Sequence, residues 1–340
     1  MILWQLIREG DDVGRATVKD VAVRAGVSPK TVSNVMNGTF PVSPGTRERV
    51  ELAMAELDYV PNFSARGLRN GRTGMIALAL PELNTAYSAE LAHHFVHHAR
   101  TQGWAIQIEE TKGGPDPEHQ LMLRARARLV DGLILNPVSL ETSAIQPGIA
   151  LPPVVVIGEV DQPIADHVWI DNVAASAAMV AHLAARGRRR IAAIGIMESE
   201  SARLRVEGYR RGLADAGLPY DPLLEVETDG WGPSDAAVVD ALLERAPEVD
   251  ALFCFTDALA LGALHALAVA GRRVPSEIAV AGYDDIWEAA YFAPALTTVG
   301  SDKSELARTA IDLLVRRIAD PERAPETITL PYEVIVRDST

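Results

Sequence analysis

Lys30 and Asn34 stand four positions apart in a short stretch with helical periodicity, so their side chains share one helix face. A lysine ammonium can donate to O6 and N7 of guanine, and an asparagine amide suits adenine. The hydroxyls of Thr31 and Ser33 suit phosphate oxygens, whereas Pro29 offers only apolar contact, such as to a thymine methyl. This spacing predicts recognition of base edges in DNA.

Three short helices would position this face. Thr17 is expected to cap the first helix, which ends at Gly26, and Ser28 to cap the second, with a third predicted from Ser43-Pro44 through Leu57. Apolar residues recur at helical spacing in each of them: Val18, Val21, Ala22 and Ala25; Val32, Val35 and Met36; Val50, Ala53, Met54 and Leu57. Two short helices joined by a glycine-containing turn form a helix-turn-helix, whose second helix enters the major groove. A small helical bundle that binds no DNA is the alternative.

The distribution of charge supports this interpretation, although the total argues against it. The 340 residues have a formal net charge of −14, which is unfavourable for a partner rich in phosphate. Residues 16–72, however, carry eight basic and five acidic side chains, whereas the part after them has a net charge of −16. A small basic part is thus joined to a large acidic part, and we expect each to have its own function.

Beyond Gly74, short apolar runs alternate with amphipathic segments. The predicted strands are Met75–Leu80, Trp104–Ile108, Leu133–Leu135, Val154–Ile157, Ile191–Ile196, Ala251–Phe255 and Ile278–Ala281. The predicted helices between them include Ala89–Arg100, Val173–Arg186, Ser201–Ala216 and Leu259–Ala270. This alternation predicts an α/β architecture of parallel sheets with helices on both faces.

Location and cofactor use are inferred from what the sequence lacks. A single cysteine, Cys254, cannot form an internal disulfide, and no apolar run approaches the ~20 residues of a membrane span. The N-terminus lacks the basic-then-apolar order of a secretion signal, and neither a P-loop nor a Gly-x-Ser-x-Gly motif is present. We expect a cytoplasmic protein that is not an enzyme, uses no cofactor and does not bind membranes.

The basic part resembles a known family. The stretch Ala16–Asn37, with Thr46-Arg47 and the run Leu57–Asn62, closely resembles the headpiece of the lactose-repressor/galactose-repressor family of bacterial transcription regulators. In that family, the positions matching Pro29, Lys30 and Asn34 vary with the operator and read bases. The resemblance implies DNA contacts from these headpiece residues and from Asn62 just beyond them: Thr17, Ser28, Pro29, Lys30, Thr31, Ser33 and Asn34.

Residues 61–72 are expected to form a hinge. In the family, the matching stretch folds into a helix on operator DNA, and two such helices, one per subunit, enter the minor groove, where a leucine wedges between base pairs. Leu68 occupies that position, with Ala65 close to the partner helix and Arg66 and Arg69 near phosphates. An exposed leucine in a flexible linker is the alternative.

From Arg72 nearly to the end, the chain resembles the effector domain of the same family, which shares its fold with periplasmic sugar-binding proteins. That fold has two doubly wound parallel-sheet subdomains with ligand in the cleft between them. The matching stretches are Val130–Ile134, Ile170–Asn172, Gly187–Ile191, Arg205–Gly208, Thr256–Gly262, Gly282–Asp285, Pro294–Val299 and Val336–Thr340. The implied parts are an extension (1–15), a helix-turn-helix headpiece (16–60), the hinge (61–72) and an effector-binding and dimerisation domain (73–340), whose subdomains are approximately 73–170 with 302–329 and 171–301 with 330–340.

Ligands of open α/β sheets bind beyond the carboxyl ends of the strands, which selects the loops after the predicted strands. Matching to the family selects many of the same positions. The resulting candidates for effector binding are Tyr87, Glu159, Arg205, Trp231, Asp257 and Asp284. An arginine fork beside carboxylates suits neighbouring hydroxyls of a sugar, and the two aromatic rings could stack on it. Asp257 has the alternative role of a helix cap, and Asp284 that of a turn residue.

Two further features qualify the resemblance. Where many relatives have an aspartate, this chain has Gly158, and Glu159 either compensates or points away. His93, His94, His97 and His98 form two i,i+4 pairs on a helix that helps to form the dimer interface in the family. A metal site needs more than two histidines, so we expect no metal there and assign these residues to the dimer face or to solvent.

These observations together predict a sequence-specific DNA-binding regulator, specifically a repressor. It would act as a homodimer on a pseudo-palindromic operator and respond to a sugar or sugar derivative in the cleft. A nucleoside or purine effector is the alternative within the family. A solute-binding protein of a transport system is the rival interpretation of the large domain.

Overall fold

The computed structural model describes residues 16–37, 40–59, 72–139, 143–146, 148, 150–160, 162–232 and 236–340. The chain divides into two compact units, Met1–Asn70 and Gly71–Thr340. The predicted extension 1–15 lies outside the described residues, and so do these predicted hinge contacts: Asn62, Ala65, Arg66, Leu68 and Arg69.

The described part of the smaller unit contains the helices α1 (Val18–Ala25), α2 (Pro29–Asn37) and α3 (Pro44–Glu56). Thr17 caps α1 as predicted, and the helix ends at Gly26, whose φ of 64° suits a residue without a side chain. Buried apolar residues of all three helices pack together as the periodicity predicted: Val21, Ala22, Ala25, Val32, Val35, Val50 and Ala53. Ser43 makes no side-chain cap to α3, which instead begins with proline.

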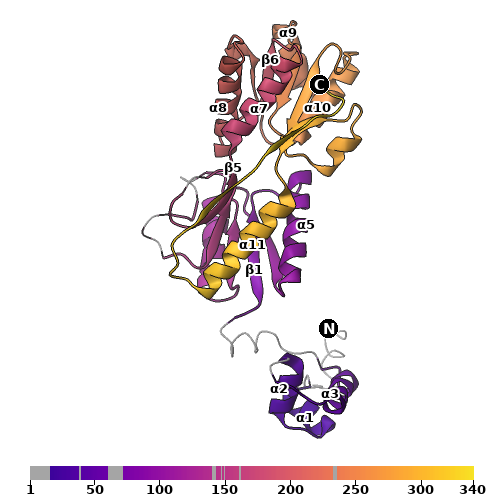
Figure 1. The fold of residues 1–340 in the computed structure, drawn as a ribbon, viewed down its shortest axis with the longest axis vertical. Helices are drawn as coiled ribbons and strands as arrows, with labels where there is room; N and C mark the ends of the chain where they lie inside the picture. The colour runs from indigo at the N-terminus through magenta and orange to yellow at the C-terminus, as the bar shows by residue number, and fades with distance from the viewer. Residues whose placement is uncertain are drawn as a thin grey trace, which may run out of the picture. The chain divides into compact units, whose positions relative to one another are not determined.

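Among its described residues, the larger unit contains two sheets of six strands, each with helices on both faces (Figure 1). The first sheet has the order β11-β5-β4-β3-β1-β2 and is parallel throughout. Its strands are β1 (Met75–Leu80), β2 (Ala105–Glu110), β3 (Gly132–Leu135), β4 (Val154–Ile157), β5 (Asp166–Ile170) and β11 (Thr327–Leu330). The helices α5 (Ala86–Thr101) and α11 (Lys303–Ala319) lie side by side on one face, and α6 (Pro115–Arg126) covers the other.

The second sheet has the order β12-β10-β9-β8-β6-β7, and within it only the pair β10–β12 is antiparallel. Its strands are β6 (Ile191–Ile196), β7 (Glu225–Glu227), β8 (Ala251–Cys254), β9 (Ala279–Tyr283), β10 (Thr297–Gly300) and β12 (Glu333–Ile335). The helices α7 (Asn172–Ala185) and α8 (Glu200–Asp215) cover one face, and α9 (Ala236–Arg245) and α10 (Asp257–Val269) the other. Two short 3-10 helices complete it, η1 (Pro222–Leu224) and η2 (Trp287–Tyr291).

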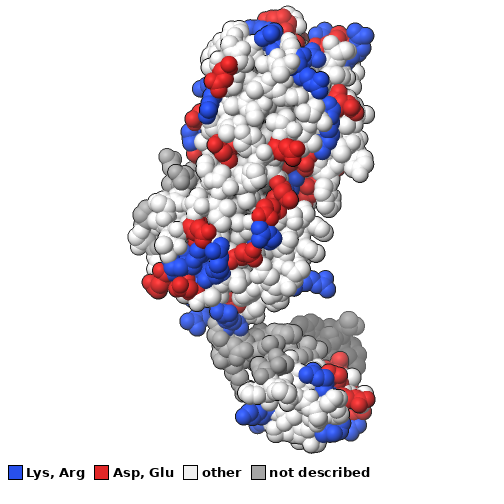
Figure 2. Space-filling model, in the orientation of Figure 1, with Lys and Arg blue, Asp and Glu red and all other residues white. Residues whose placement is uncertain are grey.

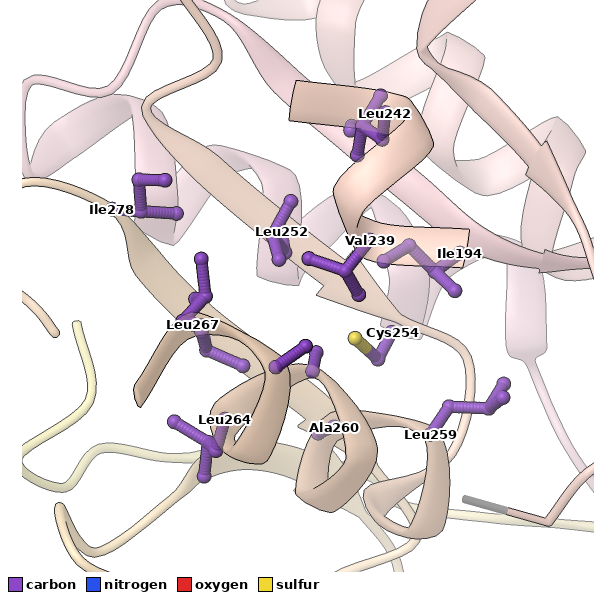
Figure 3. Close-up of a cluster of buried hydrophobic side chains, with 14 of the residues drawn as sticks. Ile194, Val239, Leu242, Leu252, Cys254, Leu259, Ala260, Leu264, Leu267 and Ile278 are labelled. Carbon is purple, nitrogen blue, oxygen red and sulfur yellow. The ribbon is translucent and has the colours of Figure 1, made fainter. Parts of the chain in front are cut away.

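Strands buried on both faces explain the apolar runs in the sequence. Along β6, Ile194 packs toward α9 and α10 while Ala193 packs toward α7 and α8. The core between the second sheet and α9 and α10 also holds Cys254, whose sulfur points among leucine and valine side chains (Figure 3). Burial raises the pKa of this thiol, so the residue acts as a small apolar side chain.

The chain passes between the two sheets three times, after β5, after β10 and after β11. The strands that lie next to these crossings were not predicted from the sequence, nor was the short β7. Their apolar pattern is interrupted by threonine, glutamate or aspartate, so the sequence did not predict them as strands. These strands are β5, β7, β10, β11 and β12. In β10 the buried Thr297 is paired, since its amide donates to the Ser339 hydroxyl at 2.8 Å.

Candidate functional site

In the smaller unit, α2 presents the predicted DNA-reading residues on the side away from its core. Val32 and Val35 are buried, whereas Pro29 and Lys30 are exposed and Asn34 is half-buried. The sequence positions Lys30 and Asn34 one turn apart, and the helix confirms that spacing. The helix can therefore offer an ammonium group and an amide to base edges.

Hydroxyl groups secure the start of α1 and α2. The Ser28 hydroxyl accepts a hydrogen bond from the Thr31 amide at 3.1 Å and lies 2.9 Å from the Thr31 hydroxyl. The Thr17 hydroxyl donates to the Asp20 carboxylate at 2.7 Å, and this bond, with that of the Thr17 amide, lowers the pKa of Asp20. Ser33, further along α2, is half-buried. These contacts explain Thr17 and Ser28 as helix caps, while their contact with DNA stays a prediction.

In the larger unit, a cleft of about 300 Å³ lies at the carboxyl ends of the strands of both sheets. The structure brings five of the six predicted effector residues to its lining: Tyr87, Glu159, Arg205, Trp231 and Asp284. Tyr87 lies in the first turn of α5, which comes after β1, and Glu159 follows β4, so both belong to the first sheet's subdomain. The other three come from the second.

Arg205 is the most heavily bonded of these residues. It is buried on α8, where its Nε donates to the Asn172 Oδ1 atom at 3.0 Å and its Nη1 donates to the Phe255 carbonyl. Its Nη2 lies 3.7 Å from the Asp284 carboxylate and 4.0 Å from that of Glu159. These contacts fix the guanidinium in the cleft, so a ligand would meet a rigid donor.

Aromatic rings surround this guanidinium. Its central carbon lies 3.7 Å from the centroid of the Tyr283 ring and 5.4 Å from that of Trp231. Burial, with the charges of Asp284 and Glu159, raises the pKa of the Tyr87 phenol, which therefore stays a neutral hydrogen-bond donor. The cleft thus combines flat apolar faces with fixed polar groups, which is typical of a small-molecule site.

Asp284 occupies a strained backbone position at the edge of the cleft. Its φ is 109°, and that of Asp285 is 50°, values that side-chain-bearing residues adopt at a cost of about 1–3 kcal/mol. Burial raises the pKa of Asp284 to about 7, although Arg205 and Lys303 act in the opposite direction. Such strain and such a shifted pKa are typical of functional positions.

Asp257 is the predicted effector residue that does not line the cleft. It is fully buried as the first residue of α10, where its carboxylate accepts from the Thr298 hydroxyl at 2.6 Å and from the Ile286 amide at 2.9 Å. Burial, together with Asp284, raises its pKa well above the usual range. The carboxylate therefore holds the loop that follows β9, and the neighbouring Thr256 lines the cleft instead.

The lining includes residues that the sequence analysis did not single out, among them Lys112, Asn136 and Asp229. Lys112 and Asn136 follow β2 and β3, so the rule of carboxyl ends, applied to every strand, would have found them. Gly158 has a φ of 89°, and a Cβ there would lie 2.6 Å from the Asn136 Oδ1 atom. A side chain at this position would have to displace the Asn136 carboxamide, and the neighbouring carboxylate that lines the cleft is that of Glu159.

Two family models match the chain. Residues 17–62 match the bacterial regulatory proteins of the lacI family, and residues 180–340 match a periplasmic binding protein-like domain. Over 331 residues, 95% of this chain and 98% of the relative, the sequence is 34% identical to the HTH-type transcriptional repressor PurR of Aliivibrio fischeri strain MJ11. The chain belongs to the lacI family.

Solved structures of this family share the fold. The Lac repressor dimer bound to operator and the anti-inducer ONPF has a TM-score of 0.82 at 29% identity, covering 95% of this chain and 98% of that one. A complex of the transcriptional regulator CelR with cellobiose has a TM-score of 0.69 at 32% identity, covering 96% and 100%. This lacI-family protein is therefore a DNA-binding regulator with an effector-binding domain, and the rival interpretation as a transport protein is wrong.

None of the described helices is long and apolar enough to cross a membrane. In the same part of the chain, no group of three or more His, Cys, Asp or Glu side chains is arranged to hold a metal ion. On the face of the larger unit shown in Figure 2, acidic and basic side chains are interspersed.

Proposed function

We propose that this protein acts in the cytoplasm as a homodimeric repressor of transcription whose operator affinity is set by an uncharged sugar. In this proposal, Lys30 and Asn34 read base edges, Pro29 makes apolar contact, and the other predicted headpiece and hinge residues contact phosphates or the minor groove. A dimer would place two headpieces on successive half-sites of a pseudo-palindromic operator. The protein catalyses no reaction in this scheme.

One observation favours a sugar as the effector. The guanidinium group of Arg205 is held in a fixed position, facing the Asp284 carboxylate and beside the ring of Trp231. The buried Arg205 guanidinium is a donor, and the buried Asp284 carboxylate, 3.7 Å away, is an acceptor. The two groups can bond neighbouring hydroxyls of one sugar ring, while the indole face of Trp231 covers the C–H groups of that sugar. The volume of about 300 Å³ is within the range of ~300–1,000 Å³ usual for small-molecule sites.

The charge of the cleft favours an uncharged effector. Its described lining contains five carboxylates, Glu82, Glu159, Glu198, Asp229 and Asp284, and two cationic side chains, Lys112 and Arg205. Excess negative charge in a partly enclosed cleft repels anions. A sugar phosphate or a nucleotide is therefore disfavoured relative to a free sugar.

A purine base is the second candidate effector. The rings of Trp231 and Tyr87 could stack on a flat base, and the similarity to the repressor PurR also favours this class. The two classes differ in what they require of Asp284. A sugar hydroxyl donates to its carboxylate, whereas purine ring nitrogens can also accept from its protonated form.

A thermal-melting screen against sugars, purine bases and nucleosides tests the effector class. We expect a sugar to raise the melting temperature and sugar phosphates to have no effect. Stabilisation by purines alone would overturn the sugar proposal. Salt-dependent binding to duplexes selected from a random pool tests the regulator itself, and failure of the full chain to bind DNA at low salt would refute it.

Variants of α8 locate the site. Arg205→Lys keeps the charge but loses the fork, so the response to the sugar should fall at least tenfold while operator binding is retained. Arg203→Ala is the matched control, because Arg203 lies on the same helix but is exposed and paired with Glu200 at 2.5 Å. An equal loss in both variants would remove Arg205 from the site.

A further inference from the structure

A buried ion pair lies outside the effector cleft, between α5 and α11. Lys303 Nζ is 3.1 Å from the Glu90 carboxylate, and the two side chains are only 8% and 6% exposed. Removing two charges from water is costly, and a buried pair is often no more stable than apolar side chains of the same size. Stability alone therefore does not require an ion pair at this place.

The remaining hydrogen bonds of the pair go to the loop that follows β9. Lys303 Nζ donates to the Asp285 carbonyl at 2.7 Å, and the Trp287 amide donates to the second oxygen of Glu90. Glu90 and Lys303 lie on helices that pack on the first sheet, whereas Asp285 and Trp287 follow a strand of the second. The pair thus joins the two subdomains through the backbone of one short loop.

The same loop carries Asp284, which faces Arg205 in the cleft. Its other described hydrogen bonds come from within the second subdomain: Asp257 accepts from the Ile286 amide, and Arg337 donates to the Asp285 carboxylate at 2.7 Å. The Trp287 ring also lies against α5, with its centroid 5.8 Å from that of His93 and 6.4 Å from that of His94. Lys303 Nζ also lies 5.9 Å from the centroid of the Tyr87 ring, so the pair is adjacent to the cleft wall. A displacement of the loop relative to α5 would move Asp284 relative to Tyr87.

We propose that Glu90 and Lys303 are positioning residues of the effector site, which hold the Asp284–Trp287 loop on α5 and α11 and so couple effector binding to the arrangement of the subdomains. This proposal rests on the proposed function, because it treats the cleft as the effector site. An effector bound to Asp284 stabilises the arrangement in which the loop is docked, and the docked loop presents Asp284 to the effector. The coupling is reciprocal.

Hydrogen exchange of the full chain without effector tests the docking. In the double variant Glu90→Met/Lys303→Met, similar volumes are kept and no charge is left buried alone, so the protein should fold. We expect amide exchange in residues 284–291 to rise at least tenfold, because both bonds to the loop are lost. The matched control is Glu305→Met/Arg308→Met, which removes an exposed pair on the same helix α11 and should leave exchange unchanged.

Exchange in 284–291 at the wild-type level in a folded double variant would overturn the proposal. If the double variant does not fold, hydrogen exchange of Glu90→Gln tests the docking of the loop instead. The amide oxygen of this glutamine can still accept a hydrogen bond from the Trp287 amide. We then expect faster exchange near Asp285 than near Trp287, and unchanged exchange at both would also overturn the proposal.

Cellobiose, the sugar in the related CelR complex, serves as the probe for coupling. If it binds the wild type, the double variant should bind it about tenfold more weakly and the control variant equally well. Equal affinity in the double variant would overturn the coupling. Failure of cellobiose to bind the wild type would count against the effector class, whereas the exchange experiment would still decide the docking.

Discussion

Across the effector cleft, the Ser201 hydroxyl donates a hydrogen bond of 2.7 Å to the Glu159 carboxylate. Ser201 lies on α8 of the second subdomain, and Glu159 follows β4 of the first. Asn172 Nδ2 donates to the other oxygen of Glu159 at 3.2 Å. The carboxylate that stands beside Gly158 therefore links the subdomains on the cleft side.

Ser201→Ala should weaken effector binding by about two- to twelvefold. The lost bond contributes about 0.5–1.5 kcal/mol to this arrangement of the two subdomains, and effector binding to it should become less favourable by that amount. Titration calorimetry of the wild type, Ser201→Ala and Ser201→Thr measures the effect, with the threonine variant retaining the hydroxyl. Tighter binding to Ser201→Ala would instead mean that Ser201 competes with the effector for Glu159.

Effector affinity should fall as the pH decreases below about 7. The pKa of Asp284 is raised to about 7 by burial, so acid protonates the carboxylate that would accept from a sugar hydroxyl. The affinity should fall by at most about tenfold per pH unit. Calorimetry between pH 5.5 and 8.5 tests this, and a wild-type profile identical to that of Asp284→Asn would contradict it.

The same pKa makes a prediction about stability. The folded-state pKa of Asp284 lies above the value of 3.8 for an ordinary aspartate, so the folded state binds this proton more tightly. Its contribution to the free energy of unfolding is fully present below about pH 3.8 and is lost as the pH rises through about 7. Denaturant unfolding should therefore show Asp284→Asn gaining stability relative to the wild type as the pH is raised from 5 to 8. A constant difference over that range would argue against the raised pKa.

Asp257→Ala should destabilise the larger unit by about 2–5 kcal/mol, because it leaves the Thr298 hydroxyl and the Ile286 amide without their buried acceptor. Asp284→Ala should cost much less stability and lose effector binding. Urea unfolding and calorimetry separate the two effects. A stable Asp257→Ala protein that fails to bind effector would restore the role predicted from the sequence.

Gly158→Ala and Gly187→Ala should lose similar stability, about 1–2 kcal/mol each, because both glycines have a φ of 89°. Only Gly158→Ala should weaken effector binding, since its Cβ displaces the Asn136 carboxamide in the cleft, whereas the Cβ at position 187 meets open space. Thermal melting gives the stability and calorimetry the affinity. Equal affinities in the two variants would exclude Asn136 from the site.

Lys30→Ala and Asn34→Ala should each cost about 1–3 kcal/mol in binding to the selected operator and relax its sequence preference at one base pair. Arg24→Ala is the control, because its guanidinium is paired with Glu56 at 2.5 Å on another helix of the headpiece. Fluorescence anisotropy with specific and non-specific duplexes measures both. A uniform loss on all duplexes would reassign Lys30 to a phosphate contact.

Much of the architecture could be predicted from the sequence because the signals were local. The Thr17 cap, the turn at Gly26 and the cap at Ser28 depend on residues within a few positions of each other. The continuous apolar runs of the central strands report burial on both faces. β10 lacked that signal because its buried Thr298 finds a partner far away in the chain, the Asp257 carboxylate. β11 lacked it because Thr327 and Thr329 face outward from the edge of the sheet.

Which carboxylates line the cleft and which are bonded inside the protein could not be predicted from local sequence. Asp257 and Asp284 both follow strands of the second sheet, and their local sequence does not distinguish them. Asp257 points inward because Thr298, on another strand, is there to donate to it, whereas Asp284 is turned toward Arg205. The pairing of Glu90 with Lys303 likewise depends on α5 and α11 packing side by side.

The sequence by itself thus determined the helix-turn-helix, the α/β class and the loops in which a ligand site must lie, because periodicity, caps and turns act over a few residues. Only the tertiary structure decided which of the loop residues line the cleft and which are buried behind it, where they stabilise the loop through hydrogen bonds. A carboxylate bonds whichever donors the fold brings within about 3 Å, and those donors come from distant segments of the chain.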